Sequence, residues 1–415
     1  MRFEEALGIA KEGIDAADPE RAVMESVSLN DGVLSVCGES FDLDNYEKIL
    51  VIGAGKASER MASGIERVLG DRISEGLVIT KKRLGLTERI EVIEGSHPLP
   101  DERSLKATRR VMELLSHCGV KDLVVVLISG GGSSLLCYPE VSLGAFREIT
   151  ERLMKAGADI KELNTVRKKL SMVKGGKLAS LAQGEVISLI ISDVVGDPLA
   201  FIASGPTVSD TSTNRDALEI LRKYGIDAND EIIECLSSEE GVVESRAKNY
   251  LIATNRRSLE VMREEAEKRG YSSLILSPFF EGEAAQLGLF LSAIAKGMEM
   301  RRLCILCGGE AVVNVKGSGR GGPNMEMAAS FALGIDGAKA SIACIASDGE
   351  DGSTYAAGAF ADNTTSSRAE ELGLNIKEHL RNNDTLSLFE KLGGLMVTGS
   401  TGTNVNSFWL LSIEE

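Results

Sequence analysis

Residues 49–58 read Ile-Leu-Val-Ile-Gly-Ala-Gly-Lys-Ala-Ser, an apolar run that ends in a turn containing two glycines. A helical pattern follows over residues 56–70. An apolar strand that leads through glycines into a helix is typical of a parallel sheet with helices on both faces. The stretch therefore predicts an α/β fold.

The same alternation continues along the chain after two N-terminal helices, one over residues 3–16 and one opening at Pro19. Because sheets of this kind need strands separated by helices, we predict two α/β domains with mostly parallel sheets, a Rossmann-like domain over residues 1–240 and a second over 241–415. The further strands of the first series are expected at 76–79, 90–94, 123–128 and 186–191, and those of the second at 250–253, 273–276, 302–307, 311–315, 341–346 and 394–398.

The composition limits the function classes. The 415 residues include 62 acidic and 46 basic side chains, a net charge of −16, and 43% are hydrophobic. These values are typical of a globular protein with a substantial core and exclude general disorder. So acidic a chain is not expected to bind nucleic acid through a broad basic surface. An anionic ligand would have to meet local cations and backbone amides in a pocket.

The cysteines and the chain start indicate a cytoplasmic protein without a membrane partner. The seven cysteines are scattered, and Cys304 and Cys307 lie on a predicted strand, where positions three apart face opposite sides and do not share a metal. Glu4 and Glu5 do not fit a secretory signal, and no apolar run approaches the roughly 18 residues that span a bilayer.

The turn after the first strand contains Gly53, Gly55 and Lys56. Ser58 stands where the dinucleotide fingerprint needs its third glycine, and no acid follows the second strand at 79–82. Lys56 is expected at a helix N-terminus, where the dipole disfavours a cation unless an anion is bound. A solvated lysine would give the same pattern, so both interpretations stay open.

The second turn is Ser129-Gly130-Gly131-Gly132-Ser133-Ser134. Its glycines would let backbone amides converge on a phosphate or carboxylate, although a plain tight turn is the alternative.

Asp193 and Asp197 follow a later strand and could hold Mg²⁺ or cap a helix. Residues 166–177 contain five cations, including Lys174, and indicate either an anion pocket or a solvated face.

The second half offers the glycine run around Arg320 and a donor-rich loop at 398–404. Residues 347–352 fail the EF-hand spacing. The three histidines pair with no serine motif, so a hydrolase triad has little support.

These strings together resemble the glycerate 2-kinases whose C-terminal part is called the MOFRL domain. The strings lie in that family's order from end to end: GAGKAS (53–58), LISGGGSSLL (127–136), VRKKLSMVKGGKLA (166–179), SDVVGDPLAFIASGPT (192–207), GGE (308–310), GRGGPNMEMA (319–328), DGEDGSTYAAGA (348–359) and TGTNVN (401–406). The resemblance implies transfer of the ATP γ-phosphoryl group to the 2-hydroxyl of D-glycerate, with Mg²⁺, in a cleft between the two domains.

The resemblance also assigns residues. Lys56 and Arg320 match positions implicated in the family's catalysis, and both would stabilise charge on the transferred phosphoryl group. Asp193 is expected to act in catalysis and, with Asp197, as a metal ligand. The expected substrate or nucleotide contacts are Gly53, Gly55, Ser129, Gly130, Gly131, Gly132, Ser133, Lys174, Asp197, Asn324, Glu326 and Asn404, with Asp348 a further candidate.

The chain departs from the family pattern in its second half. Pro323 and Met325 stand where arginine and glutamine are usual, Ser353 and Tyr355 replace proline and aspartate, and Ser407 replaces aspartate.

An NAD(P)H-dependent hydroxypyruvate reductase is the rival enzyme, with Lys81 and Lys82 available for a 2′-phosphate. A non-catalytic anion-binding protein is the third hypothesis, and the chain is expected to be a monomer or homodimer.

Overall fold

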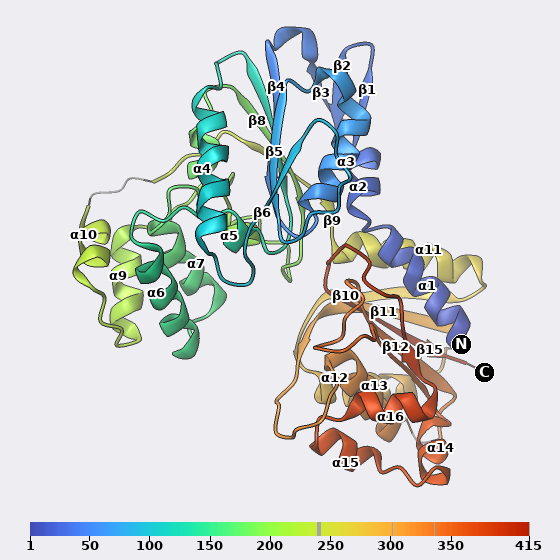
Figure 1. The fold of residues 1–415 in the computed structure, drawn as a ribbon. Helices are drawn as coiled ribbons and strands as arrows, with labels where there is room; N and C mark the ends of the chain where they lie inside the picture. Colours follow the sequence, from blue (N-terminus) through green and yellow to red (C-terminus); the bar gives the residue numbers. More distant parts are fainter. Residues whose placement is uncertain (239–241, 301, 336, 415) are drawn as a thin grey trace. The chain divides into compact units, whose positions relative to one another are not determined.

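The structure, a computed structural model, describes residues 1–238, 242–300, 302–335 and 337–414 (Figure 1). The chain divides by its contacts into two compact units. The N-terminal unit comprises Pro19–Ser192 and Asp197–Ile252, and the C-terminal unit comprises Met1–Asp18, Asp193–Gly196 and Ala253–Glu415. The domain boundary predicted after residue 240 lies outside the described residues.

A six-stranded sheet with the order β6-β5-β4-β7-β8-β9 forms the centre of the N-terminal unit. β4 pairs in parallel with β5 and β7, β5 with β6, and β7 with β8, and every residue of β7 is buried. This full burial explains the unbroken apolar run over residues 123–128 of that strand. The strands are β4 (Lys48–Ala54), β5 (Glu75–Thr80), β6 (Glu91–Glu94), β7 (Asp122–Ile128), β8 (Glu185–Ile191) and β9 (Lys248–Ala253).

Helices cover this sheet, and a separate group of helices packs on its own core. Buried side chains of α6, α7, α9 and α10 form that second core, and Figure 1 shows these four helices gathered together. The helices are α2 (Pro19–Ser26), α3 (Ser58–Leu69), α4 (Glu102–Ser116), α5 (Gly132–Leu135), α6 (Leu143–Lys155), α7 (Ile160–Lys169), α8 (Lys177–Ser180), α9 (Asn214–Lys223) and α10 (Asp230–Ser237), with 3₁₀ turns η1 (Leu43–Asn45), η2 (Gly70–Arg72) and η3 (Ile202–Ser204).

The C-terminal unit contains the sheet β10-β11-β15-β12-β13-β14. β10 and β11 are parallel, whereas β15 is antiparallel to both β11 and β12, and β13 is antiparallel to β12 and β14. Four strands therefore share one direction and two oppose it. The strands are β10 (Ser272–Glu283), β11 (Leu303–Val312), β12 (Ala340–Ala346), β13 (Gly358–Asp362), β14 (Leu395–Met396) and β15 (Ser407–Ile413).

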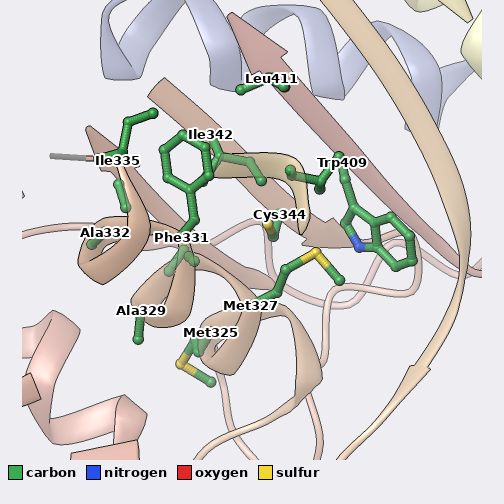
Figure 2. Packing of buried hydrophobic residues seen from close by; sticks show 14 of the residues in the cluster. Met325, Met327, Ala329, Phe331, Ala332, Ile335, Ile342, Cys344, Trp409 and Leu411 are labelled. Atoms are coloured by element: carbon green, nitrogen blue, oxygen red, sulfur yellow. The ribbon is translucent and has the colours of Figure 1, made fainter. Parts of the chain in front are cut away.

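Helix α13 is buried almost all round, which matches its apolar sequence. Figure 2 shows Phe331 of this helix beside Ile342 of β12 and Met327 pointing toward Trp409 of β15, while Met325 of the same cluster points to the other side of the helix. The other helices of the unit are α1 (Phe3–Asp15), which packs on α11 (Asn255–Lys268), together with α12 (Ala284–Gly297), α13 (Pro323–Gly334), α14 (Thr365–Glu371), α15 (Ile376–Arg381) and α16 (Thr385–Leu392).

The α/β class and the strands of the first series are confirmed, but three details differ from the sequence prediction. The strand expected at 250–253 belongs to the first sheet as β9. The runs at 302–307 and 311–315 were predicted as two strands, but residues 303–312 form the single strand β11 and residues 313–315 lie outside it. Within β11, Gly309, at a φ of 146°, leaves no room for a Cβ against Phe280 O. The strands β13 and β15 and the antiparallel sheet β1 (Val27–Asn30), β2 (Val33–Val36) and β3 (Glu39–Asp42) were not predicted.

Within the described ranges, no helix combines the length and the apolar character needed to cross a membrane.

Candidate functional site

Two glycine turns interlock at the carboxyl ends of β4 and β7. The Lys56 backbone N–H donates to Gly130 O over 2.9 Å, and the Ala57 N–H donates to Ser129 Oγ over 3.1 Å. In return, the Ser129 N–H donates to Ala54 O over 3.2 Å. Since β4 and β7 are parallel neighbours, their carboxyl ends meet at the sheet edge where α/β proteins bind ligands.

Glycine is required for this close approach. Gly55 has a φ of 148°, and a Cβ built on it would lie 2.0 Å from Ser129 Oγ. A Cβ on Gly53 would lie 2.5 Å from Leu127 O. The packing of the two turns therefore explains both glycines, and their contact with a ligand stays a prediction.

Lys56 and His97 flank the second turn. A Cβ built on Gly131, which has a φ of 80°, would lie 3.2 Å from Lys56 Cγ and 2.9 Å from His97 Cδ2. The Lys56 side chain is exposed, and α3 begins at Ser58, so the lysine lies just before the helix. Burial and then the charges of Lys56 and Lys81 lower the pKa of His97 to about 4. His97 is therefore neutral at pH 7.

Two further cations support the turn from inside the unit. Lys174, fully buried, donates from Nζ to Ser133 O over 2.6 Å and to Leu136 O over 3.0 Å. Arg167 Nη2 donates to the same Ser133 O over 3.4 Å. Burial, together with the positive charge of Arg167, lowers the pKa of Lys174 to about 7. The structure thus gives Lys174 a supporting contact, and its predicted contact with a ligand stays a prediction.

These buried cations lack acidic neighbours. Burial lowers the pKa of Arg167, and burial together with the charge of Arg167 lowers the pKa of Lys174, with no carboxylate of the described residues contributing to either shift. Within the same described part of the chain, Arg167 Nε is buried without a hydrogen-bond partner. Buried cations and an unused donor beside a glycine turn favour binding of an anion.

The segment around η3 closes the turn from another side. Ser133 Oγ lies 2.6 Å from Ser204 Oγ, and both Ala203 and Ser204 are left-handed, with φ of 51° and 62°. Such a backbone costs a residue other than glycine about 1–2 kcal/mol. Strain of this kind clusters at functional sites. We call the set Gly55, Lys56, His97, Ser129–Ser134, Arg167, Lys174 and Ser204 the glycine-turn site.

Asp193 and Asp197 follow β8, and the contact division gives Asp193 to the C-terminal unit and Asp197 to the N-terminal unit. Burial raises the pKa of Glu310, and the charges of Asp193 and Glu281 raise it further. Asp193 therefore lies in an acidic environment. In the part of the chain that the structure describes, no group of three or more His, Cys, Asp or Glu side chains is arranged to hold a metal. Metal binding by the two aspartates stays a prediction.

A small polar pocket lies in the C-terminal unit at the start of α13 and the end of β12. Its volume is about 140 Å³. Of the predicted residues, Asn324, Asp348 and Asn404 line it, and four of its lining residues are acids. The pocket is lined by Glu310, Ala311, Pro323, Asn324, Ala346, Asp348, Glu350, Asp351, Gly352, Asn404, Asn406 and Ser407.

Asn324 is held on every side by hydrogen bonds within this pocket. Its Nδ2 donates to Asp351 Oδ1 over 3.1 Å and to Ser407 Oγ over 2.9 Å, and its Oδ1 accepts from Trp409 Nε1 over 2.9 Å. Ser407, a departure from the family pattern, is thus part of this network. The predicted substrate contact of Asn324 would need this amide to exchange a partner.

Asp351 holds the N-terminus of α13. Its carboxylate accepts from the backbone N–H of Asn324 over 3.0 Å and of Met325 over 2.8 Å. Burial, and then the charge of Asp348, raises the pKa of Asp351 to about 7 although these hydrogen bonds lower it. The free donors of the helix start are therefore already used by a carboxylate of the same unit.

Two other predicted residues of this unit, Arg320 and Glu326, are not in the lining of the pocket. Arg320 is anchored through its backbone to Asp384 and Leu386, and its side chain is exposed. Glu326 is buried, and its Oε2 accepts from Asn383 Nδ2 over 3.2 Å. Burial raises the pKa of this carboxyl. The structure therefore places Glu326 in a polar contact inside the unit, outside the lining of the pocket.

The sequence analysis did not identify Asp351, Arg167 or Ser204 as site residues. Asp351 lay in a segment that failed the EF-hand spacing and was otherwise used only as a family string, and Arg167 lay in the cationic run whose burial was left open. The signals available were the three acids in residues 348–351 and the five cations in residues 166–177. The hydrogen bonds of Asp351, Arg167 and Ser204 join residues that are far apart in the chain, and the spacing of residue types along the sequence does not reveal such contacts.

Comparison with known proteins gives end-to-end matches. The family described as "Domain of unknown function (DUF4147)" matches residues 5–237, and the "MOFRL family" matches residues 303–407. The chain is 41% identical to the glycerate 2-kinase of Pyrococcus horikoshii and 38% identical to the D-glycerate 2-kinase of Thermotoga maritima, in each case over 97% of this chain and 96% of the relative. The solved structure of a Thermotoga maritima glycerate kinase superposes with a TM-score of 0.90 at 36% identity, covering 99% of both chains.

Proposed function

The chain belongs to the glycerate 2-kinase family with a MOFRL domain, and from this membership we propose that it transfers the γ-phosphoryl group of ATP to the 2-hydroxyl of D-glycerate. The products are 2-phosphoglycerate and ADP. The observation that carries the proposal is the similarity over 97% of the chain to two proteins named for this activity.

The glycine-turn site supports the binding of an anionic group. Lys56 and the backbone N–H groups of Gly130 and Gly131 would contact phosphate oxygens, whereas the Gly132 N–H already donates to Ser129 O. Lys174 and Arg167 keep the Ser133 end of the turn in place. Phosphoryl transfer spreads negative charge over the oxygens of the transferred group, so positioned donors and cations lower its barrier.

In the reaction, the 2-hydroxyl oxygen forms a bond to the γ-phosphorus as the bond from that phosphorus to the bridging oxygen of ADP breaks. We assign Asp193 to accept the hydroxyl proton, and Arg320 to stabilise charge on the phosphoryl oxygens. Asn404 and Asp348, which line the small pocket, offer hydrogen-bond acceptors to a hydroxyl group.

Mg²⁺ fits the chemistry around Asp193. Burial raises the pKa of Glu310, the charges of Asp193 and Glu281 raise it further, and a bound cation would relieve the repulsion among these carboxylates. Asp193 and Asp197 would hold Mg²⁺ together with substrate phosphates, as one or two carboxylates usually do. When bound, the ion would neutralise charge on the phosphates.

We also infer a cytoplasmic location and small-molecule partners only, ATP and D-glycerate, for a monomer or homodimer. No disulfide joins any of the seven cysteines, all of which are described, and this supports a reducing compartment.

The test is a coupled assay with Mg-ATP and D-glycerate, followed by enolase without a mutase. Because enolase acts on the 2-phosphate ester, phosphoenolpyruvate absorbance is expected to appear only if the 2-hydroxyl was phosphorylated. L-glycerate serves as the control. If the enzyme binds ATP but no phosphoenolpyruvate absorbance appears, the proposal is overturned.

The reductase hypothesis gains no support from the geometry. Ser58 is buried and donates from Oγ to Gly55 O over 2.8 Å and to Ile79 O over 2.9 Å, so it fills the place of the third glycine. Oxidation of NADPH by hydroxypyruvate without ADP release would reverse this assignment.

A further inference from the structure

A cavity of about 820 Å³ lies in the N-terminal unit, apart from the residues assigned above. Its volume is within the range of about 300–1,000 Å³ found for small-molecule sites. It is bounded by α7, by α9 and by the segment from 200 to 212. The lining residues are Asp159, Lys161, Glu162, Thr165, Lys168, Ala200, Phe201, Ser209, Asp210, Thr211, Ser212, Asp216, Glu219, Ile220 and Lys223.

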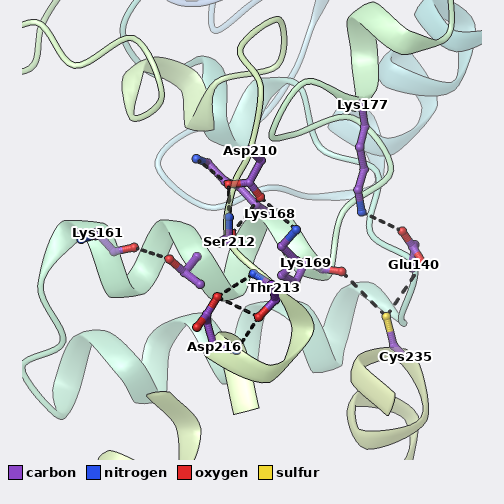
Figure 3. A network of polar contacts seen from close by, with 11 residues as sticks. Glu140, Lys161, Lys168, Lys169, Lys177, Asp210, Ser212, Thr213, Asp216 and Cys235 are labelled. Atoms are coloured by element: carbon purple, nitrogen blue, oxygen red, sulfur yellow. Dashed lines mark hydrogen bonds and ion pairs between the residues drawn. The ribbon is translucent and has the colours of Figure 1, made fainter. Parts of the chain in front are cut away.

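A buried ion cluster fixes one wall of this cavity (Figure 3). Lys168 Nζ lies 3.5 Å from Asp210 Oδ1, Lys169 Nζ lies 3.0 Å from Asp210 Oδ2, and no side chain of the three is more than 6% exposed. Ser212 Oγ donates to both oxygens of Asp210 over 3.0 and 2.9 Å. Although burial opposes ionisation, Lys168 and these hydrogen bonds hold the pKa of Asp210 below its ordinary value. The wall is therefore preformed.

The charges of the lining favour an uncharged polar ligand group. Five carboxylates line the cavity against three lysines. An isolated polyphosphate would be repelled there, whereas hydroxyl and amino groups would find acceptors. Phe201 adds a ring face, with Lys168 Nζ 5.9 Å from the ring centroid. Ring and acceptors together suit an aromatic base attached to a sugar.

Two pairs of nearby residues connect this cavity to the glycine-turn site. Phe201 lines the cavity directly before η3, and Ser204 at the end of η3 contacts Ser133. Lys168 lines the cavity, and its neighbour Arg167 donates to the Ser133 carbonyl. In agreement, η3 packs against both α5 and α7. An anion-binding turn and a cavity that disfavours anions thus lie side by side in one unit.

We propose that this cavity binds the base and ribose of the nucleotide whose phosphates occupy the glycine-turn site, with Phe201 stacking on the base. The inference rests on the proposed kinase function for the identity of the ligand as a nucleotide. The acids on α7 and α9 then accept hydrogen bonds from the ribose hydroxyls or the base.

The experiment measures binding separately from catalysis, using the full-length chain and isothermal calorimetry with adenosine, ADP and inorganic tripolyphosphate. Phe201→Ala is expected to weaken adenosine and ADP binding at least about tenfold, as loss of one aromatic stacking contact does. Tripolyphosphate binding should change less than about twofold. In kinetics, the KM for ATP should rise about tenfold while the KM for D-glycerate stays within about twofold.

Phe279→Ala is the matched control, because Phe279 is an exposed phenylalanine of the C-terminal unit with its own cation neighbour, Arg256, at 5.4 Å. It should leave every constant unchanged. Thr165→Trp, which fills the cavity from α7, should reproduce the loss of adenosine binding if Phe201→Ala does not fold, and Phe201→Tyr should retain binding.

The two proposals can fail separately. Kinase activity with an unchanged KM for ATP in Phe201→Ala and Thr165→Trp would overturn the cavity assignment and leave the kinase function standing. The opposite result is also possible: the protein binds adenosine and both variants abolish this binding, but the protein does not phosphorylate glycerate. That result would support the cavity assignment and overturn the proposed reaction.

Discussion

The two units each fix a turn with a buried ion, but the ions have opposite sign. In the N-terminal unit, the Lys174 ammonium holds the carbonyls of Ser133 and Leu136. In the C-terminal unit, the Asp351 carboxylate holds the N–H groups of Asn324 and Met325. The first arrangement leaves positive charge available beside a glycine turn, whereas the second uses the helix donors internally and lines its pocket with acids. This difference is our reason for placing the proposed anion site in the N-terminal unit.

The largest expected effect comes from disturbing the first glycine turn, where Gly55 packs against Ser129 of the turn that Lys174 supports. Gly55→Ala should lower the free energy of unfolding by about 3 kcal/mol or more, because the new Cβ would overlap Ser129 Oγ at a left-handed backbone position. Urea denaturation measures this change. Gly38→Ala is the control, since Gly38 has a φ of 90° with nothing within 4 Å and should cost about 1 kcal/mol. Equal losses in the two variants would show that the close approach is unimportant.

The second-largest effect is expected from a substitution that removes Lys56, the exposed cation of the same turn. Lys56→Ala should lower kcat at least about a hundredfold with the thermal unfolding temperature unchanged, because the charge acts on the developing phosphoryl oxygens. Steady-state kinetics with D-glycerate measures it. Lys82→Ala, another exposed lysine of the N-terminal unit, should keep normal turnover. Near-normal turnover in Lys56→Ala would reassign this lysine to the solvated surface.

The third effect tests the carboxylate of the C-terminal unit. Asp351→Asn should cost about 2 kcal/mol at pH 8, because an amide NH₂ would face the N–H donors of α13. The pKa of Asp351 is raised from 3.8 to about 7 on folding, so its protonation stabilises the protein below about pH 4 and this stabilisation is lost as the pH rises through 7. The variant should lose that part of the pH dependence in chemical denaturation. Glu350→Gln, at an exposed position, should retain it.

The last effect is the smallest when it is expressed per pH unit, and its pH dependence has the opposite sign to that of Asp351. The pKa of Lys174 falls from 10.5 to about 7 on folding, so its contribution to stability is present above about pH 10.5 and is lost as the pH falls through 7. Lys174→Met should remove a slope of up to about 1.4 kcal/mol per pH unit between these values. Denaturation curves from pH 7 to 10 measure the slope. Lys121→Met, an exposed control, should leave it, and a persisting slope in Lys174→Met would contradict the burial argument.

Sequence patterns predicted the parallel strands of the N-terminal unit and the position of its glycine turns, since apolar runs and glycine spacing are local signals. β15 was missed although residues 408–411 are apolar and β-forming, because it follows a long loop at the chain end and pairs with distant strands. β9 was assigned to the wrong series for the same reason.

Within the candidate site, local patterns identified Lys56 and the second glycine turn as features to examine. The roles of Lys174 and Asp351 depend on burial and on hydrogen bonds across 26 to 41 residues of chain. Such contacts follow from the tertiary fold, so the residue pattern alone did not distinguish a buried ion from a solvated one.

The central place of β15 has a consequence for synthesis. Strands β10 and β11 leave the ribosome long before residues 407–413, and until those residues emerge, β11 and β12 each present an unpaired edge. Exposed edges invite pairing with other chains. We expect the nascent C-terminal half to depend on chaperones or on rapid completion of translation, and a truncation before residue 407 to yield aggregates even though the sheet of the N-terminal unit is intact.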